Sequence, residues 1–424
     1  NDRKRVGEWA IRSESERSRQ AMLSSISHAL AVDPDKWNNQ PNLLNLLNGT
    51  LELDTLKFRS FRRDDFLTMK AGVKYDPKAK CPEWIDHLSF IFGMESKNQQ
   101  EKEQAPDLIE AFQLMAGYSL LSGNPDQVFF ILHGGGENGK SVTLTTIRTI
   151  LGDYATHITP KTLMQQQNPD KARSDLVRLQ YKRLVTSSES KKGEKLDIGL
   201  IKELSGGEPI VARDLFKSEI QFKAEFTIFF STNPLPIIND ASHSIWRRLW
   251  LIPFNQKIPA DRKIPDYEKK LVESEGSGIL NWMIEGLQKY YEKGHLVKPK
   301  AIQDATDEYK EDEDPLGDYM KLRIIEDPNS RETSSDIYSD YMAWCAIRSI
   351  KYPISKRSLS VTLMDHGFKP YRNKHTRGFE GLKLVYNRDG IMISDEQRNE
   401  KIQQNEREQI QVTEYVMADY RESN

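Results

Sequence analysis

The fold is decided by the stretch Val128-Phe129-Phe130-Ile131-Leu132-His133-Gly134-Gly135-Gly136-Glu137-Asn138-Gly139-Lys140-Ser141. Its first five residues form a continuous apolar run, which is typical of a buried central strand. The glycines that follow predict a tight turn, and a helix is expected to start near Lys140. A strand, a glycine-rich turn and a helix in this order predict an α/β fold.

The turn matches the whole phosphate-loop pattern G-x-x-x-x-G-K-[ST] over residues 134–141. Glycines let backbone N–H groups surround an anion, and the following helix directs its positive end toward that anion. We expect Lys140 to reach the β- and γ-phosphates of ATP and Ser141 to bind Mg²⁺. The alternative is a chance glycine-rich turn, which the flanking strand and helix disfavour. The residues expected to contact the nucleotide are Gly134, Gly135, Gly136, Glu137, Asn138, Gly139, Lys140, Ser141 and Val142.

Further strands are predicted by three short apolar runs at residues 184–185, 226–230 and 249–252. The first run leads to Glu189, a candidate Walker B carboxylate that would polarise the attacking water or help to hold Mg²⁺. The second leads to Asn233, which suits a sensor that hydrogen-bonds the γ-phosphate or its water. The alternatives are an exposed glutamate after a strand and a cap or turn before Pro234. The order of phosphate loop, carboxylate and asparagine favours the functional interpretation of both.

The composition excludes several classes of protein. The 424 residues hold 61 Lys and Arg against 63 Asp and Glu, so the formal net charge is −2 and a uniformly basic surface is excluded. The two cysteines, Cys81 and Cys345, lie far apart in sequence, which rules out a disulfide scaffold or a cysteine zinc site and fits a reducing compartment. The longest apolar run has about five residues, far short of the ~20 that span a bilayer. We expect no membrane partner.

The region before the phosphate loop is predicted to be a mainly helical domain, residues 1–104. Its first ~30 residues are expected to be helical, and Asn48-Gly49 is a favoured hairpin turn between two short apolar strands. Residues 94–106 are predicted to be a surface loop, with a helix from about 105 to 121. The ATPase domain is assigned to residues 105–303.

The acidic stretch 304–318 predicts a domain boundary, although a solvated helix face is an equally good description of its charges. Residues 315–390 are expected to form a basic module that is winged-helix-like, and residues 391–424 an acidic tail. The expected elements of the module are helices at 319–325, 337–347 and 356–365, and strands at 368–371 and 381–386. Its densest positive charges are Lys356, Arg357, Lys369, Arg372, Lys374 and Arg377.

Taken together, these motifs resemble superfamily 3 helicases of the phage, plasmid and poxvirus primase–helicase type. The pattern N-K-x-D of GTPases and the D-E-x-x box of other helicases are absent. The segments that carry the resemblance stand in family order at 45–53, 75–84, 134–141, 183–189, 202–213, 231–236 and 245–249. One departure is Ser188, which stands where many related ATPases carry a second acid.

The resemblance implies an AAA+-related P-loop ATPase core and an ATP-dependent, ring-forming DNA helicase of phage or plasmid replication. It implies a hexamer with ATP bound between neighbours, movement 3′→5′ on single-stranded DNA at a replication fork, and an intracellular place in the host-cell cytoplasm. It also implies that a primase or primase–polymerase domain precedes this part of a longer chain. Arg248 is then expected to reach the γ-phosphate of the neighbouring subunit, with Arg247 as the other candidate and structural ion pairs as the alternative.

A β-hairpin is predicted between Gly207 and Phe226, with a basic and aromatic tip. In the family that this chain resembles, such a hairpin points into the ring channel, so Arg213, Phe216 and Lys217 are the expected DNA contacts. Lys217 can meet a phosphate, and an aromatic ring can stack on a base for about 1–3 kcal/mol. The alternatives are packing for Phe216, a solvated turn charge for Lys217 and an internal contact for Arg213.

Two other functions remain open at this point. One is a DNA-dependent ATPase that loads or remodels without unwinding. The other is a nucleotide-stabilised ring that presents an attached primase to DNA. Strand displacement on a forked duplex distinguishes these from a helicase.

Overall fold

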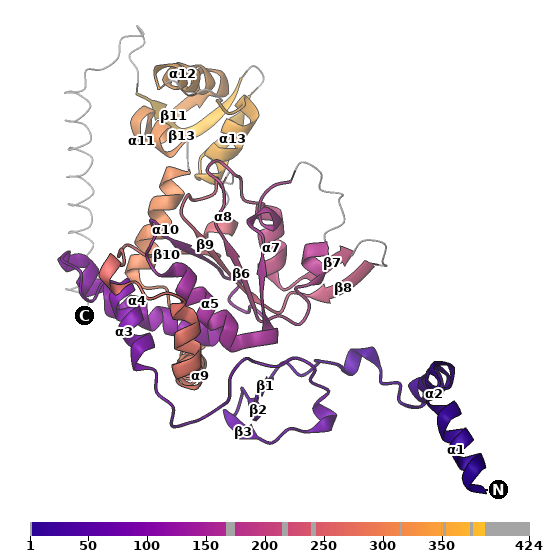
Figure 1. Cartoon of the computed structure of the whole chain (residues 1–424). Helices are drawn as coiled ribbons and strands as arrows, with labels where there is room; N and C mark the ends of the chain where they lie inside the picture. Colours follow the sequence, from indigo (N-terminus) through magenta and orange to yellow (C-terminus); the bar gives the residue numbers. More distant parts are fainter. Residues whose placement is uncertain are drawn as a thin grey trace, which may run out of the picture. The chain divides into compact units, whose positions relative to one another are not determined.

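The computed structural model describes residues 2–166, 174–213, 219–238, 243–313, 316–348, 350, 353–373 and 376–385 (Figure 1). The chain divides into two compact units, one of residues 1–238 and 244–307 and the other of residues 239–243 and 308–424. The predicted acidic tail at 391–424 lies outside the described residues. No helix in the described part of the chain is long and apolar enough to cross a membrane.

The first unit is built on a parallel sheet of five strands in the order β10-β4-β9-β6-β5. Its strands are β4 (Phe129–His133), β5 (Ala155–Ile158), β6 (Leu184–Ser188), β9 (Thr227–Thr232) and β10 (Leu249–Pro253). The predicted α/β class and four of these strands are confirmed. The edge strand β5 was missed because its four residues include two polar ones and give no apolar run. Since all the strands run parallel, their carboxyl ends share one edge of the sheet.

Two long helices, α4 (Gln99–Tyr118) and α9 (Tyr267–Lys293), pack with their backbones in contact. A Cβ atom added to Gly117 would lie 2.2 Å from the backbone nitrogen of Leu287, and one added to Gly286 would lie 2.1 Å from the carbonyl oxygen of Gln113. The buried Gln113 side chain joins the same helices, because its Nε2 donates to the Trp282 carbonyl at 3.0 Å. Glycine at 117 and 286 is therefore required by the close approach of the two helices.

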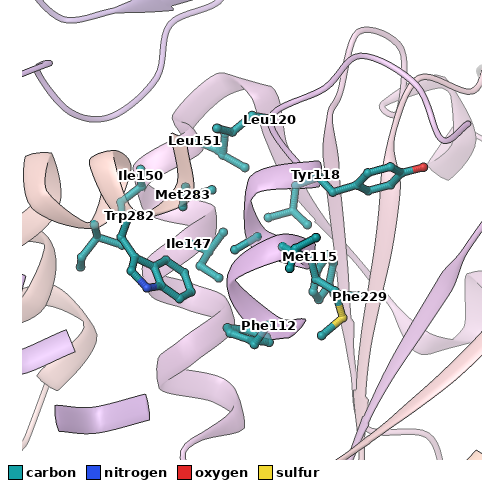
Figure 2. Close-up of a cluster of buried hydrophobic side chains, with 14 of the residues drawn as sticks. Phe112, Met115, Tyr118, Leu120, Ile147, Ile150, Leu151, Phe229, Trp282 and Met283 are labelled. Atoms are coloured by element: carbon teal, nitrogen blue, oxygen red, sulfur yellow. The ribbon is translucent and has the colours of Figure 1, made fainter. Parts of the chain in front are cut away.

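A large apolar cluster with members from Leu44 to Ile302 forms one core of the first unit. Figure 2 shows side chains of α4, α5 (Lys140–Leu151), β9 and α9 gathered in part of this cluster. Its labelled members are Phe112, Met115, Tyr118, Leu120, Ile147, Ile150, Leu151, Phe229, Trp282 and Met283. The domain division expected at 104/105 falls inside α4, which starts at Gln99 because the Asn98 side chain caps it by accepting from Gln100 N at 3.0 Å. Residues 99–106 are thus helical instead of loop.

The amino-terminal part of this unit holds a small antiparallel sheet of β1 (Leu43–Leu46), β2 (Gly49–Glu52) and β3 (Lys57–Arg59). Its hairpin turns at Leu47-Asn48, one residue earlier than predicted, and Gly49 pairs with Leu46. Glycine is required at 49 by crowding against β3, since a Cβ on Gly49 would lie 2.5 Å from the Arg59 carbonyl oxygen. The remaining α-helices and strands of the unit are α1 (Asp2–Ser13), α2 (Glu16–Ala29), α3 (Pro82–Ile91), α6 (Ser174–Val177), α7 (Ile198–Gly206), β7 (Pro209–Arg213) and β8 (Glu219–Lys223). Two helices contain a boundary between the units: α8 (His243–Trp246), at 243/244, and α10 (Lys300–Asp312), at 307/308.

The second unit has its own core and combines helices with an antiparallel sheet of order β11-β13-β12. Its elements are α11 (Gly317–Arg323), β11 (Ile324–Thr333), α12 (Ser334–Ile347), α13 (Lys356–Asp365), β12 (Lys369–Arg372) and β13 (Arg377–Leu384). The helix predicted at 319–325 ends at Arg323, and the strand β11 was not predicted. Its sequence is polar and contains Pro328, so only pairing with β13 makes it a strand. Both cysteines are free and buried.

Gly286→Ala should lower the free energy of unfolding of the first unit by about 1–3 kcal/mol, because the added methyl must push α4 and α9 apart. The measurement is urea unfolding. Gly206→Ala is the control, since its Cβ would meet nothing within 4 Å, and a change within about 0.5 kcal/mol is expected there. Equal unfolding midpoints for both variants would show that the helix contact tolerates a side chain.

Candidate nucleotide site

The phosphate loop follows β4 and leads into α5, as the sequence predicted. Packing limits two of its glycines: a Cβ on Gly134 would lie 2.1 Å from the Phe254 carbonyl oxygen, and Gly139 has φ +84° and touches Ile91. Gly135 and Gly136 differ, because a Cβ at either position would meet nothing within 4 Å. Contacts within the protein therefore do not require glycine at 135 and 136. Small residues there leave room for a ligand beside the loop.

The Lys140 side chain is buried, and its hydrogen-bond partners among the described residues are all neutral. Its Nζ donates to the carbonyl oxygens of Gly134 (2.7 Å) and Gly135 (3.3 Å) and to the Oδ1 atoms of Asn138 and Asn233 (3.0 Å each). Burial lowers the pKa of Lys140 to about 8, and the negative charge of Glu189 offsets part of that effect. A buried cation that lacks a hydrogen-bonded carboxylate favours the binding of an anion at this position.

Glu189 and Asn233 follow β6 and β9, which are neighbours in the sheet. The Glu189 backbone leaves the sheet in a left-handed conformation (φ +49°) while its N–H donates to the Ser231 carbonyl at 2.7 Å. This conformation is uncommon for a residue with a side chain, and here it exposes the Glu189 carboxylate. The fold therefore brings Lys140, Glu189 and Asn233 to the same edge of the sheet.

These three residues share one cavity of about 680 Å³, a size that fits a nucleotide. The cavity is lined by Asp86, His87, Phe90, Gly136, Glu137, Asn138, Gly139, Lys140, Ser141, Val142, Glu189, Ser231, Asn233, Ile258, Asp261, Arg262, Lys263, Ile264 and Tyr267. The contributions from α3 and from the segment 258–267 were not predicted. Neither carries a motif, and only the folding of the chain brings them beside the phosphate loop.

Glu137 places a negative charge within the phosphate loop, and two lysines balance it. Its carboxylate pairs with Lys263 and with Lys257 at 3.1 Å, and these contacts lower the pKa of Glu137. The Glu137 carbonyl also accepts from the Ile258 N–H at 2.8 Å. In the same segment, the guanidinium of Arg262 lies 4.7 Å from the ring centre of Phe90. The segment that follows β10 is thus fastened to the loop and to α3.

His87 of α3 supports the first turn of α5. Burial lowers the pKa of His87 to about 4, so the ring is neutral at physiological pH. The Thr143 hydroxyl donates its only proton to the Gly139 carbonyl at 2.9 Å, so His87 Nε2–H must be the donor in its 3.0 Å bond to Thr143. This bond fixes the ring tautomer and holds α3 against the loop.

The two arginines before β10 differ in their surroundings. Arg248 is buried and its Nη1 donates to the Ser205 hydroxyl at 3.2 Å, and burial lowers the pKa of Arg248. Arg247 is exposed and donates to Gln127 at 3.1 Å. The expectation that Arg248 reaches a neighbour does not fit its contacts, whereas Arg247 is accessible. Strand β10 starts at Leu249 and pairs in parallel with β4, which starts at Phe129. Both arginines precede β10, so they lie at the edge of the sheet opposite the phosphate loop.

The hairpin predicted after Gly207 is present as β7 and β8, with Arg213 opposite Glu219. One face of each strand is exposed, and the other packs on the unit through Ile210, Ala212 and Phe222. The predicted DNA contacts Phe216 and Lys217 lie outside the described residues. Arg213 is exposed at the end of β7.

Ser141 and Glu189, the expected Mg²⁺ ligands, both line the cavity. Among the residues that the structure describes, no three His, Cys, Asp or Glu side chains form a cluster able to hold a metal. Two protein oxygens suit Mg²⁺, which usually completes its shell with waters and substrate phosphates. The residues present therefore fit a nucleotide with its Mg²⁺.

A parallel α/β sheet that carries a phosphate loop at its carboxyl edge defines the class of P-loop proteins. Residues 1–93 match the family model described as "D5 N terminal like", and residues 132–248 match a family of unknown function, DUF5906. These matches, together with viral relatives that carry helicase and primase names, support the resemblance to the superfamily 3 primase–helicase family.

Three viral relatives show the extent of the similarity. A protein of Acanthamoeba polyphaga mimivirus, provisionally named helicase L207/L206, is 25% identical over 346 residues, which cover 74% of this chain and 34% of that protein. Helicase 121R of Invertebrate iridescent virus 3, also a provisional name, is 26% identical over 80% of this chain and 38% of its own length. The provisionally named primase C962R of African swine fever virus (isolate Tick/Malawi/Lil 20-1/1983) is 24% identical over 72% of this chain and 33% of its own.

The chain thus spans about a third of the length of these relatives. Among solved structures, the apo structure of the NrS-1 C terminal region (305-718) is 14% identical, with a TM-score of 0.43, over 73% of this chain and 78% of that one.

Nucleotide affinity should fall as pH rises through about 8. A bound polyanion favours the protonated Lys140, so affinity is full below that pKa and declines by up to tenfold per pH unit above it. Titration of ADP by calorimetry between pH 7 and 9.5 measures the change. Lys140→Met should bind weakly and without this pH dependence, and a Lys140→Met profile as steep as that of the wild type would assign the titration to another group.

Proposed function

We propose that this chain is an ATP-dependent DNA helicase that works as a ring, with an AAA+-related core. The observation that carries the proposal is the buried Lys140, whose partners are all neutral and which shares a cavity with Glu189 and Asn233. The helicase and primase names of the viral relatives support a role in replication. Movement 3′→5′, a hexamer and phage or plasmid replication remain proposals from the family resemblance.

In this proposal the phosphate loop binds the triphosphate through its backbone N–H groups and the Lys140 ammonium. Ser141 and Glu189 would hold the Mg²⁺ that accompanies the nucleotide, and this ion would supply positive charge to the phosphates. Glu189 accepts the proton of the attacking water, and Asn233 orients that water or the γ-phosphate. Since Asn233 already bonds Lys140 at 3.0 Å, the sensor and the phosphate lysine respond to the same ligand.

The trans-acting arginine is assigned to Arg247 instead of Arg248. The rise of about 3.3 Å per residue puts roughly 13 Å of strand between the start and the end of β4. An arginine before β10 therefore cannot reach the phosphate loop of its own chain, but an exposed one can meet the nucleotide of a second copy. An arginine in this role is worth about 10³–10⁵ in rate.

Contact with DNA is proposed at the β7–β8 hairpin, through Arg213, Phe216 and Lys217, and at the second unit. The order helix, strand, helix, helix, strand, strand in the second unit supports a winged helix. Lys356, Arg357, Lys369, Arg372 and Arg377 are exposed on it, which suits duplex binding or docking of another subunit. A primase or primase–polymerase partner is proposed from the relatives' names and their greater length.

Glu189→Gln should bind ATP as well as the wild type and lose at least 10²-fold in turnover, because an amide cannot accept the proton of water. ATPase rates with and without single-stranded DNA, and strand displacement on a forked duplex, are the measurements. Wild-type turnover by Glu189→Gln would contradict the Walker B assignment. Turnover by the native chain without displacement favours loading or remodelling, and neither activity favours a scaffold for a primase.

Arg247→Ala and Lys140→Ala proteins should each be inactive, and their mixture should recover part of the ATPase activity. In mixed rings some interfaces pair an intact Lys140 with an intact Arg247. Subunit exchange is verified separately by native mass spectrometry. Arg248→Ala is the matched variant, and its mixture with Lys140→Ala should show no recovery beyond the activity of Arg248→Ala alone. Recovery with Arg248→Ala and not with Arg247→Ala would return the role to Arg248.

A further inference from the structure

The loop between β6 and α7 carries three exposed lysines, Lys191, Lys192 and Lys195. None of them has a carboxylate at ion-pair distance among the described residues. The acidic residue between them, Glu194, is half-buried and its carboxylate accepts from the Lys191 N–H at 3.0 Å, so the three lysines face one negative charge within the loop. The loop therefore presents three positive charges to solvent directly after the proposed catalytic Glu189.

The loop is held in place on both sides. Leu196 N donates to the Ile237 carbonyl at 3.0 Å, and Ile237 N donates to the Glu194 carbonyl at 2.8 Å. On its other side, Gln165 N donates to the Lys195 carbonyl at 2.8 Å. Leu196 is fully buried and anchors the loop. The loop thus connects the segment after β5 with the segment that follows Asn233.

We propose that Lys191, Lys192 and Lys195 form a binding site for the phosphate backbone of single-stranded nucleic acid, in addition to the β7–β8 hairpin. The inference rests on the proposed function, in which the chain acts on DNA. Lysines on flexible stems suit a line of phosphates and need no fixed geometry. A protein partner would need an apolar centre to its interface, and this loop offers none because its Leu196 is buried.

The position of the loop connects this site to hydrolysis. Lys191 lies two residues after Glu189, whose N–H is bonded to Ser231 of the neighbouring strand. The loop is also bonded to Ile237, four residues after Asn233. In this inference, nucleic acid bound to these lysines shifts the loop, and with it the backbone at Glu189 and at Asn233. We expect the site to contribute to the stimulation of the ATPase by DNA.

The test compares K191Q/K192Q/K195Q with K74Q/K78Q/K80Q in the full chain. The second variant removes the same charge from three equally exposed lysines of the same unit. The affinity for a fluorescein-labelled oligo(dT) is measured by anisotropy across a salt series. ATPase stimulation is expressed as the ratio of each variant's rates with and without the oligonucleotide.

The loop variant should lower the slope of log affinity against log salt by about 2, or roughly 0.7 for each lysine, and should reduce the stimulation ratio. The control should match the wild type in both. Equal losses in the two variants, or no loss in the loop variant, overturn the inference while leaving the proposed function intact. A wild-type chain that binds no oligo(dT) overturns both.

Discussion

The close approach of α4 and α9 at Gly117 and Gly286 is the constraint on which the first unit depends. This contact fixes α9 against α4. Helix α9 begins at the cavity residue Tyr267 and contributes side chains to the apolar cluster along its length. On the way its buried Glu275 accepts from the backbone N–H groups of Glu83 and Trp84, at 2.9 Å each, which caps α3. That cap holds α3 where His87 and Ile91 meet the phosphate loop.

This arrangement gives the nucleotide site a wall from outside the P-loop segment itself. The sheet supplies Lys140, Glu189 and Asn233, whereas α3 and the segment after β10 supply the opposite side of the cavity. Ion pairs of Glu137 with Lys257 and Lys263 join the segment after β10 to the phosphate loop. A charged ligand at the phosphate loop would therefore also change the electrostatic energy of these ion pairs, because Glu137 is part of the loop.

A net charge of −2 is compatible with the proposed binding of nucleotide and nucleic acid, because binding depends on where the charges lie. The proposals use positive groups at three places: the buried Lys140, the loop after Glu189 and the exposed lysines and arginines of the second unit. The carboxylate of Glu137, within the phosphate loop, is paired with Lys257 and Lys263, so it opposes an anion less than a free carboxylate would. Local arrangement, and not total charge, decides where an anion binds.

The sequence by itself determined the parallel α/β core, the phosphate loop and the order Lys140, Glu189, Asn233. Each depends on local signals: an apolar run, glycines at fixed spacing, and polar residues at the ends of buried strands. It also determined the hairpin of β7 and β8, through alternating exposed and buried positions. Only the tertiary structure decided that residues before and after 104 share one core, that β5 and β11 are strands, and that Arg248 is buried while Arg247 is exposed. These features depend on contacts between residues far apart in the chain, and adjacent arginines with the same chemistry carry no local signal that distinguishes them.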